Sequence, residues 1–550
     1  MAFSKLSAAQ SALGYDNDAD ESSRKAVDLS NNLSSRERYL ILANRARVTH
    51  DNEKAIEYYE NLAKGSPEDL DIEMALGGLY EANIVLDKAK ERYAFVLQRD
   101  PKSADALLAL GRVEVMNGNA QNGIDYFERA RSLAVQNDNQ EQNAAALHAI
   151  GVGYKIINKT DEALQNLKEA LTIRRKIGQK RGMAASLNEI GKVSALAGDT
   201  KTALSSYSEA LDLRREIGDK RGVGGTLLDL GNVYDDKGDH DKALDYYKQS
   251  LQIEREIGDE GMQAICLNNI GNARFAKGDY EDALTYFQQA LQLREKAQAP
   301  ADIVESVHNI AETSAKMGQF DQAVTQYLRA LDLRRTIGDP RGGAIESYSL
   351  GTIFQNQGRF DAALNSKAEA LKTFNEIKDR TFWMAEILSG YGDVLIEASR
   401  GDEAAKYLED ALSLSRELKN DGMTAQALGY QGDAAFVHGD YKTAKGLYEK
   451  ADQAAARTTE TDKKLIAKLN LAKLAIQEGR GREAIATLRP LSEKAEALGL
   501  KYMAVQCSLL MAEAMVQMKD YAHAKPALEQ ILLRSDKLGL QPLIDRKMTQ

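Results

Sequence analysis

Histidine, cysteine and paired carboxylates are the residues of this chain that could do chemistry, and their spacing predicts no shared site. The six histidines are spread along 550 residues without the i, i+3 or i+4 spacing that places two metal ligands on one helix. Cys266 and Cys507 are too few and too far apart in sequence for a disulfide framework or a four-cysteine zinc site. Adjacent carboxylates such as Asp235 and Asp236 are typical of a solvated helix face. We therefore expect no metal site.

The motifs of the common enzyme classes are missing from the sequence. It contains no Walker-type phosphate loop, no dinucleotide-binding GxGxxG, no GxSxG, no HExxH, no CxxC and no kinase HRD or DFG motif. We therefore expect a protein that is not an enzyme, without catalytic residues or a cofactor.

The net charge and the lack of long apolar stretches argue against nucleic acid and membranes as partners. The 72 basic and 82 acidic residues give a net charge of −10, which disfavours a general binder of nucleic acid or anionic membranes. No apolar stretch approaches the 18 residues of a membrane span, and the first residues, MAFSKLSAAQSALGY, lack the apolar core of a signal peptide. We expect a cytoplasmic protein that does not insert into membranes.

An internal repeat organises the elements that must position any site. Three stretches align at a spacing of 40 residues: LNEIGKVSALAGDTKTAL (187–204), LLDLGNVYDDKGDHDKAL (227–244) and LNNIGNARFAKGDYEDAL (267–284). A small residue recurs at Gly111, Gly151, Gly191, Gly231, Gly271, Ala311, Gly351, Gly392, Gly432, Ala472 and Ala512, and steps of 34 to 36 residues extend the series back to Ser7. The chain therefore holds fourteen units.

Each unit has the pattern of a helix, a tight turn and a second helix. Twelve residues after the first small site a second one follows, and it is alanine in thirteen of the fourteen units. A large apolar residue comes four residues later in all but two units, which have Ser23 and Lys367 there. Apolar residues follow the period of an amphipathic helix on both sides of a turn glycine such as Gly198 or Gly238. Aspartates that follow this glycine, such as Asp199 and Asp279, suit the first amides of the next helix.

These features resemble the tetratricopeptide repeat. The first helix of that family carries a Leu-Gly pair, as at Leu110-Gly111 and Leu230-Gly231, and a tyrosine, approximated by Tyr80 and Tyr234. Its second helix has an alanine and aromatic series, as in Ala283-Phe287-Ala290, and a proline closes the unit, as at Pro67 and Pro101. The resemblance implies an all-α solenoid, a right-handed superhelix of about fourteen helix-turn-helix units. The 40-residue units look like the long variant in kinesin light chains, in Leu-Gly-Asn-repeat adaptors and in bacterial signalling regulators.

Changes of repeat length suggest three zones within one continuous solenoid. Residues 1–110 hold units of 34 to 36 residues, 111–385 hold the central 40-residue units, and 386–550 follow the extra residue before Gly392. Met1 falls inside the first helix with no capping segment, so we expect that the chain was cut from a longer protein. The last residues, LGLQPLIDRKMTQ, are predicted to form a partial capping helix.

A recurrent basic run at the end of the second helix has two interpretations. Arg174, Arg175 and Lys176 could form a basic patch or a localisation signal. The run recurs in register at Arg214 and at Arg334, however, where cations suit the end of a helix and an aspartate in the next turn can pair with them. We favour the structural interpretation.

The resemblance places the candidate binding residues on the first helix of each unit, along the concave wall. They are Asn188, Lys192, Asn232, Asp235, Asn268, Asn272, His308, Glu312, Gln355 and Asn356. An asparagine amide offers a donor and an acceptor, which suits the backbone of an extended peptide. The alternative is that asparagine is only tolerated on an exposed helix face, although its helix propensity is poor.

We therefore expect a non-catalytic scaffold that binds an extended peptide or a partner protein in its concave groove. Two alternatives stay open. The chain is the sensory region of a larger signalling protein, such as a bacterial serine/threonine kinase or transcription regulator, or the repeat serves to oligomerise. The sequence identifies neither the partner nor the oligomeric state.

Overall fold

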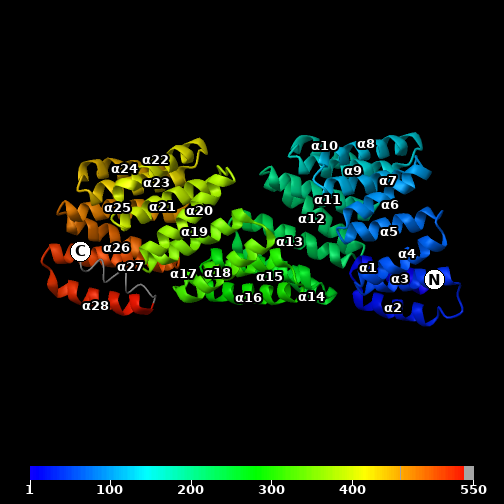
Figure 1. Ribbon diagram of the computed structural model, residues 1–550, viewed down its shortest axis with the longest axis horizontal. Coiled ribbons are helices and arrows are strands. Elements are labelled where there is room, and N and C mark those ends of the chain that lie inside the picture. Colours follow the sequence, from blue (N-terminus) through cyan, green and yellow to red (C-terminus); the bar gives the residue numbers. More distant parts are fainter. Residues whose placement is uncertain (459, 538–550) are drawn as a thin grey trace. The chain divides into compact units, whose positions relative to one another are not determined.

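The computed structural model describes residues 1–458 and 460–537, which form 28 α-helices and no strand (Figure 1). Successive helices pair as hairpins, so the prediction of an all-α repeat array of about fourteen units is confirmed. Odd-numbered helices are the first helix of each hairpin, called helix A below, and even-numbered helices are helix B. The partial capping helix predicted at 538–550 lies outside the described residues.

The helices divide between two compact units, Met1–Cys266 (unit 1) and Leu267–Gln550 (unit 2), and the division falls inside α15 (Glu260–Ala276). Whether repeat length sets further boundaries near residues 110 and 385 stays a prediction. The other helices of unit 1 are α1 (Ala2–Leu13), α2 (Asp16–Asp28), α3 (Ser35–Val48), α4 (Asn52–Gly65), α5 (Leu70–Ala82), α6 (Leu86–Arg99), α7 (Ala104–Met116), α8 (Ala120–Gln136), α9 (Gln140–Ile156), α10 (Thr160–Ile177), α11 (Lys180–Leu196), α12 (Thr200–Glu216), α13 (Lys220–Asp236) and α14 (His240–Ile257).

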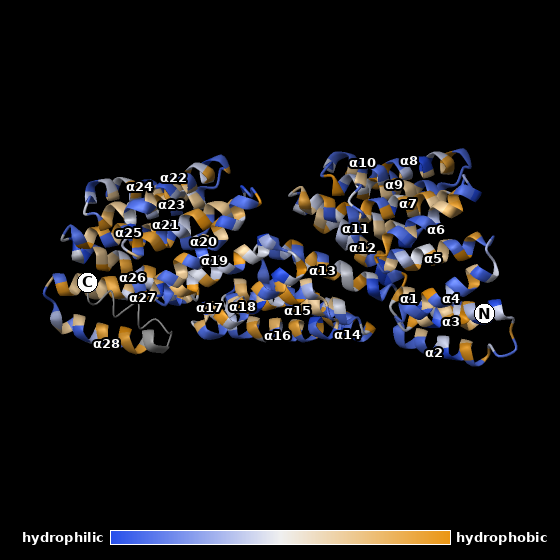
Figure 2. Ribbon diagram, viewed as in Figure 1, coloured by the Kyte–Doolittle hydropathy of each residue, from blue (hydrophilic) through white to orange (hydrophobic). Residues whose placement is uncertain are grey.

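The described part of unit 2 continues with thirteen further helices. They are α16 (Tyr280–Lys296), α17 (Pro300–Lys316), α18 (Phe320–Ile337), α19 (Pro340–Asn356), α20 (Phe360–Glu376), α21 (Phe382–Glu397), α22 (Gly401–Glu417), α23 (Asp421–Val437), α24 (Tyr441–Arg457), α25 (Thr461–Gln477), α26 (Gly481–Ala497), α27 (Lys501–Gln517) and α28 (Tyr521–Lys537). Apolar and polar residues alternate along these helices (Figure 2). None of the described helices combines the length and the apolar character that a membrane span requires.

The small residue of helix A is explained by the ring of helix B. A Cβ atom built on Gly231 would lie 2.4 Å from Cε1 of Tyr247, and one on Gly111 would lie 2.3 Å from Cε1 of Phe127. These rings are buried, Tyr247 to 1% exposure and Phe127 to 2%. Because glycine has no Cβ, the ring packs directly against the backbone of helix A, and the two helices approach too closely to leave room for a methyl group.

The turns within the hairpins follow the predicted chemistry. Gly198 and Gly238 have φ angles of 78° and 75°, in the left-handed region that glycine adopts without steric cost. Asp199 then caps the next helix, since its carboxylate accepts from the Thr202 amide at 3.1 Å. Asp279 differs from this expectation, because its carboxylate accepts from Arg274 at 2.8 Å and makes no cap.

The first hairpin of unit 1 returns to helices far along the same unit. Arg181 of α11 donates to the carbonyl of Ala12 at 3.0 Å. Arg221 of α13 pairs with Asp16 of α2 at 2.9 Å. These contacts join residues that are more than 160 positions apart in sequence, so unit 1 closes on itself.

Unit 2 contains a comparable return. The Tyr280 hydroxyl of α16 donates to the carbonyl of Leu498 at 3.3 Å. Val505 of α27 belongs to the same buried cluster as Phe320 of α18 and Leu350 of α19. The hairpin α27–α28 therefore packs against helices near the start of unit 2.

Candidate functional site

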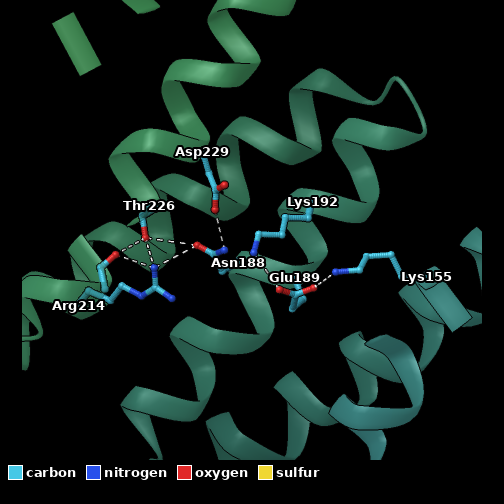
Figure 3. A network of polar contacts seen from close by, with 8 residues as sticks. Lys155, Asn188, Glu189, Lys192, Arg214, Thr226 and Asp229 are labelled. Carbon is cyan, nitrogen blue, oxygen red and sulfur yellow. Dashed lines mark hydrogen bonds and ion pairs between the residues drawn. The ribbon is translucent and has the colours of Figure 1, made fainter. Parts of the chain in front are cut away.

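A network of charged side chains joins neighbouring A helices of unit 1, α9 and α11. Glu189 of α11 lies between Lys155 of α9, whose Nζ is 2.6 Å from its Oε2, and Lys192, whose Nζ is 3.2 Å from its Oε1 (Figure 3). Burial opposes ionisation of this carboxyl, but the charge of Lys192 and the hydrogen bond from Lys155 outweigh it and lower the pKa of Glu189. The predicted residue Lys192 is thus part of a fixed ionic contact.

Asn188 is the centre of the adjoining hydrogen-bond network. Its amide nitrogen donates to Oδ2 of Asp229 on α13 at 2.9 Å (Figure 3). Its oxygen accepts from the Arg214 guanidinium at 3.1 Å and from the Thr226 hydroxyl at 3.3 Å. The side chain is only 6% exposed, and burial also raises the pKa of Asp229. The protein itself therefore uses both the donor and the acceptor of Asn188, which fixes the positions of α11 and α13.

A pocket of about 410 Å³ opens beside this network in unit 1. Its lining includes two residues that the sequence predicted, Asn188 and Lys192, together with the arginines at 181, 214 and 221. Asp219 and Asp229 are its acidic lining residues, and Leu228 and Met262 supply apolar surface. The pocket thus combines cations, carboxylates and apolar groups, as a site for a peptide segment does.

Arginines at the end of helix B join three hairpins to the next one, a role that was not predicted from the sequence. Arg174 donates to the Gly182 carbonyl at 2.9 Å and to the Ser186 hydroxyl at 2.6 Å. The same contacts recur exactly 40 residues later at Arg214, and again at Arg294, which donates to the Ser306 hydroxyl at 2.7 Å. A serine or threonine twelve residues after each arginine was the signal in the sequence. The structural interpretation of the basic run is confirmed.

Glu254 interrupts this arginine series. It stands at the position that arginine occupies in four neighbouring units, and Cys266 stands where three of these units have serine or threonine (Ser186, Thr226 and Ser306). Glu254 is 1% exposed, and its two carboxylate oxygens have no hydrogen-bond partner in the described part of the chain. Burial, followed by the charge of Asp259, raises the pKa of Glu254 to about 7, although Arg221 opposes the shift.

Several predicted residues of unit 2 are buried in networks of the same kind. Asn268 is 2% exposed, donates to Glu305 at 3.2 Å and accepts from Asn309 at 3.0 Å. His308 Nδ1 lies 2.9 Å from Oε2 of the buried Glu346. Burial disfavours the His308 cation, but Glu346 outweighs it and raises the pKa of the imidazole.

Gln355 of α19 connects the predicted groove to a buried lysine. Its amide nitrogen donates to Asp393 at 2.7 Å and to Glu397 at 3.0 Å. Its oxygen accepts from Lys367 of α20 at 2.5 Å. Burial, followed by the charge of Glu397, raises the pKa of Asp393 to about 7, and Lys367 and Gln355 oppose the shift. The Asp393 carboxyl and the Lys367 ammonium thus share one buried site.

The remaining predicted residues are more accessible. Asn272 is exposed, and Glu312 and Asn356 are partly exposed. Asn232 accepts from the Tyr247 hydroxyl at 2.9 Å, and Asp235 lies 2.7 Å from Nδ1 of His240. The ten predicted residues therefore separate into buried residues that join hairpins and accessible residues that a ligand can reach.

Comparison with protein families agrees with this geometry. The tetratricopeptide repeat family model matches residues 102–176, 182–256 and 223–296, and the model of the MalT-like TPR region matches residues 277–468. Together they cover more than half of the chain. The chain is a tetratricopeptide repeat protein.

Solved structures show the same fold, with 431 matching chains. A signal transduction ATPase with numerous domains and a tetratricopeptide repeat sensor, from Pyrococcus horikoshii, is 17% identical; the match covers 64% of this chain and 54% of that chain, with a TM-score of 0.50. BtubC from P. vanneervenii is 21% identical over 40% of this chain and 92% of its own, with a TM-score of 0.38. Yeast Tom70 is 17% identical over 94% and 100%, with a TM-score of 0.37. The likeness to the ATPase, at 17% identity, shows the fold alone.

The curated proteins contain no match to this tetratricopeptide repeat protein. Among its described residues, no group of three histidine, cysteine or acidic side chains is placed to hold a metal ion. Both cysteines are buried free thiols, and burial raises the pKa of each to about 11. At neutral pH the two thiols are therefore protonated and poorly nucleophilic.

Proposed function

We propose that this tetratricopeptide repeat protein is a non-catalytic scaffold that binds an extended segment of a partner protein on the inner helices of unit 1. The observation that carries the proposal is that Asn188 and Lys192 line one pocket together with Asp229 and Arg221. Membership of a repeat family whose curved surfaces serve as binding faces supports the same role.

The contacts assign different tasks to the predicted residues. Asn188 is buried and hydrogen-bonded through both its amide nitrogen and its oxygen, so its task is to position α11 against α13. Lys192 pairs with Glu189, but its side chain is 40% exposed and lines the pocket, so the other N–H groups of its ammonium can donate to a carboxylate or carbonyl of the ligand. In unit 2 the exposed Asn272 is the corresponding candidate for contact with a peptide backbone.

Selection of binding peptides tests this assignment. Peptides from a random displayed library are selected on the full chain, and their affinity is then measured for the wild type and for Lys192→Glu. We expect the substitution to weaken the selected peptides by about tenfold, which corresponds to roughly 1.4 kcal/mol. Lys201→Glu is the matched control, because Lys201 is exposed on α12 and does not line the pocket. Equal affinity of the two variants would contradict the pocket assignment.

A sensory role within a signalling protein is the second candidate. It is favoured by the match of residues 277–468 to the MalT-like TPR region and by the likeness to an ATPase whose repeats are described as a sensor. The genomic reading frame around the codon for Met1 tests it. An open frame that continues into an ATPase, kinase or DNA-binding domain supports this role, and in-frame stop codons flanking the repeat array contradict it.

A further inference from the structure

Neighbouring B helices are joined by ion pairs at one fixed register. The first partner stands twelve residues after the buried alanine of one helix B, and the second stands six residues after the buried alanine of the next. Arg175 and Glu209 form this pair at 2.5 Å, and Arg335 and Glu369 form it at 3.5 Å. Glu295 and Arg329 form it with the signs exchanged. Opposite charges at this register are therefore a recurrent contact between units.

Two cations occupy this register between α22 and α24. Arg416 stands twelve residues after Ala404, and Lys450 stands six residues after Ala444. Both side chains are exposed, and the described part of the chain gives neither of them an ion pair. Other units attract each other through opposite charges at this register, whereas Arg416 and Lys450 repel each other. An anion bound between these two cations would attract both.

The same two residues line a pocket of about 390 Å³ in unit 2. Lys419 and Arg457 supply two further cations, and Thr424 and Gln453 supply uncharged polar groups. Asp421 is the acidic lining residue, and its carboxylate lies 2.6 Å from the Arg457 guanidinium. Arg416, Lys419 and Lys450 are left as three positive charges around one cavity, in a chain whose net charge is −10.

The backbone holds Lys419 at the entrance of the α22–α23 turn in an unusual conformation. Its φ angle is 53°, in the left-handed region; at this register other units have Gly178, Gly218 and Gly338, and three have Asp138, Gln298 and Lys378 in the same conformation. Glycine adopts this conformation without steric cost, whereas a side chain strains it. The chain thus places a cationic side chain beside the pocket at a position where glycine would be more stable.

We propose that this pocket binds a phosphate-type dianion, either a free phosphate compound or a phosphorylated side chain of a partner protein. Three cations that have no ion pair among the described residues match the two negative charges of a phosphate monoester and its three acceptor oxygens. The guanidinium of Arg416 can donate to two of these oxygens at once, and the ammonium groups of Lys419 and Lys450 act as point charges. The site is lined by α22, α23, α24 and the turn between α22 and α23, so it shares no residue with the peptide pocket of unit 1.

The test uses the ion pair that the other units supply. Lys450→Glu in the full chain recreates the Arg–Glu pair of Arg175 and Glu209, so it removes the anion site while it preserves the contact between helices. Lys445→Glu is the matched control, since Lys445 is an exposed lysine of α24 that does not line the pocket. Calorimetric titrations at constant ionic strength measure inorganic phosphate, a phosphoserine peptide and the same peptide without phosphate.

We expect inorganic phosphate or the phosphoserine peptide to bind the wild type and the Lys445→Glu variant equally, and to bind the Lys450→Glu variant at least about tenfold more weakly. Binding of inorganic phosphate as tight as that of the peptide identifies a free phosphate compound as the ligand. Tighter binding of the phosphopeptide identifies a partner protein. Absence of binding by both probes, or equal binding to the Lys450→Glu variant, overturns the proposal.

Discussion

The ammonium of Lys367 lies 2.5 Å from Oε1 of Gln355, in the space that an aromatic or aliphatic side chain fills in most other hairpins. Lys367 is 2% exposed and also donates to the Gly390 carbonyl at 3.1 Å. A Cβ atom on Gly351 would lie 2.6 Å from its Cγ, so the aliphatic stem does the packing of a ring. One buried lysine thus combines a core contact with a charge that faces Asp393 and Glu397.

Replacement of Lys367 by leucine separates these two tasks. Leucine stands at the same position in four other hairpins, at Leu167, Leu408, Leu488 and Leu528, so the packing is kept. Because the substitution removes the cation that faces Asp393, we expect the free energy of unfolding at pH 7.5 to fall by about 3 kcal/mol. Urea unfolding measures it, with the exposed Lys372→Leu of the same helix as control. An unchanged midpoint would show that the Lys367 charge contributes nothing to stability.

Glu254 predicts a pH dependence of stability. Its pKa is raised from 4.5 to about 7, so the folded chain binds more protons than the unfolded chain between these values. The free energy of unfolding therefore falls as the pH rises through this window, by about 3 kcal/mol in total. Glu254→Gln should remove this fall in the free energy of unfolding. The difference in stability between the variant and the wild type should therefore favour the variant more at pH 8 than at pH 4.5.

Native-state hydrogen exchange of the α14 amides at several pH values measures the effect of Glu254 locally. Glu256→Gln is the control, since Glu256 is exposed on the same helix. A wild type and a Glu254→Gln variant with the same pH profile would show that the buried carboxyl does not titrate in this range.

Two glycines of unit 1 test whether closure of the unit contributes to stability. Gly14 and Gly118 have φ angles of 85° and 82°, so alanine strains both turns by a similar amount, about 1 kcal/mol. A Cβ atom on Gly14 would also lie 3.0 Å from the Arg221 nitrogen and 3.2 Å from Cδ1 of Ile257, whereas one on Gly118 meets nothing within 4 Å. We expect Gly14→Ala to destabilise unit 1 more and to accelerate hydrogen exchange in α1. Equal effects of the two substitutions would mean that the return of α1 to α13 adds no stability.

Arg214 connects the stability of unit 1 to its pocket. Arg214→Met keeps the stem but removes the charged donor from the carbonyls of Asn188 and Gly222, which then keep only the Thr226 hydroxyl as a side-chain donor, so we expect a loss of about 3 kcal/mol in urea unfolding. The Asn188 amide also loses its fixed orientation at the pocket wall, so peptide affinity should fall as well. Arg215→Met on the exposed side of α12 is the control and should change neither quantity. A loss of affinity without a loss of stability would assign Arg214 to the ligand instead of the scaffold.

The hairpins were predictable because their determinants are local. Two kinds of glycine stand at fixed offsets within one unit. One packs against a ring, as Gly231 packs against Tyr247, and the other forms the turn, as Gly238 does. The periodic repetition of these offsets was sufficient to predict the number of helices and their pairing.

The candidate site was predictable only in part. The resemblance predicted Asn188 and Lys192 on the concave wall, but the sequence did not show that the Asn188 amide is hydrogen-bonded to Asp229, Arg214 and Thr226. Whether a polar side chain faces a ligand or its own chain depends on which groups the next unit presents. Those groups are 26 to 41 residues away in sequence, so the helical period of one unit does not reveal them.

The sequence by itself determined that this chain is a tetratricopeptide array of helical hairpins, since each hairpin is specified by small residues, rings and turn glycines at short range. Only the tertiary structure decided which polar residues form hydrogen bonds inside the protein and which stay accessible to a ligand. It also decided that Asp16 meets Arg221 and that Tyr280 meets Leu498. These contacts depend on the small rotation between successive units. The rotation accumulates over many hairpins, so the sequence of one repeat does not reveal them.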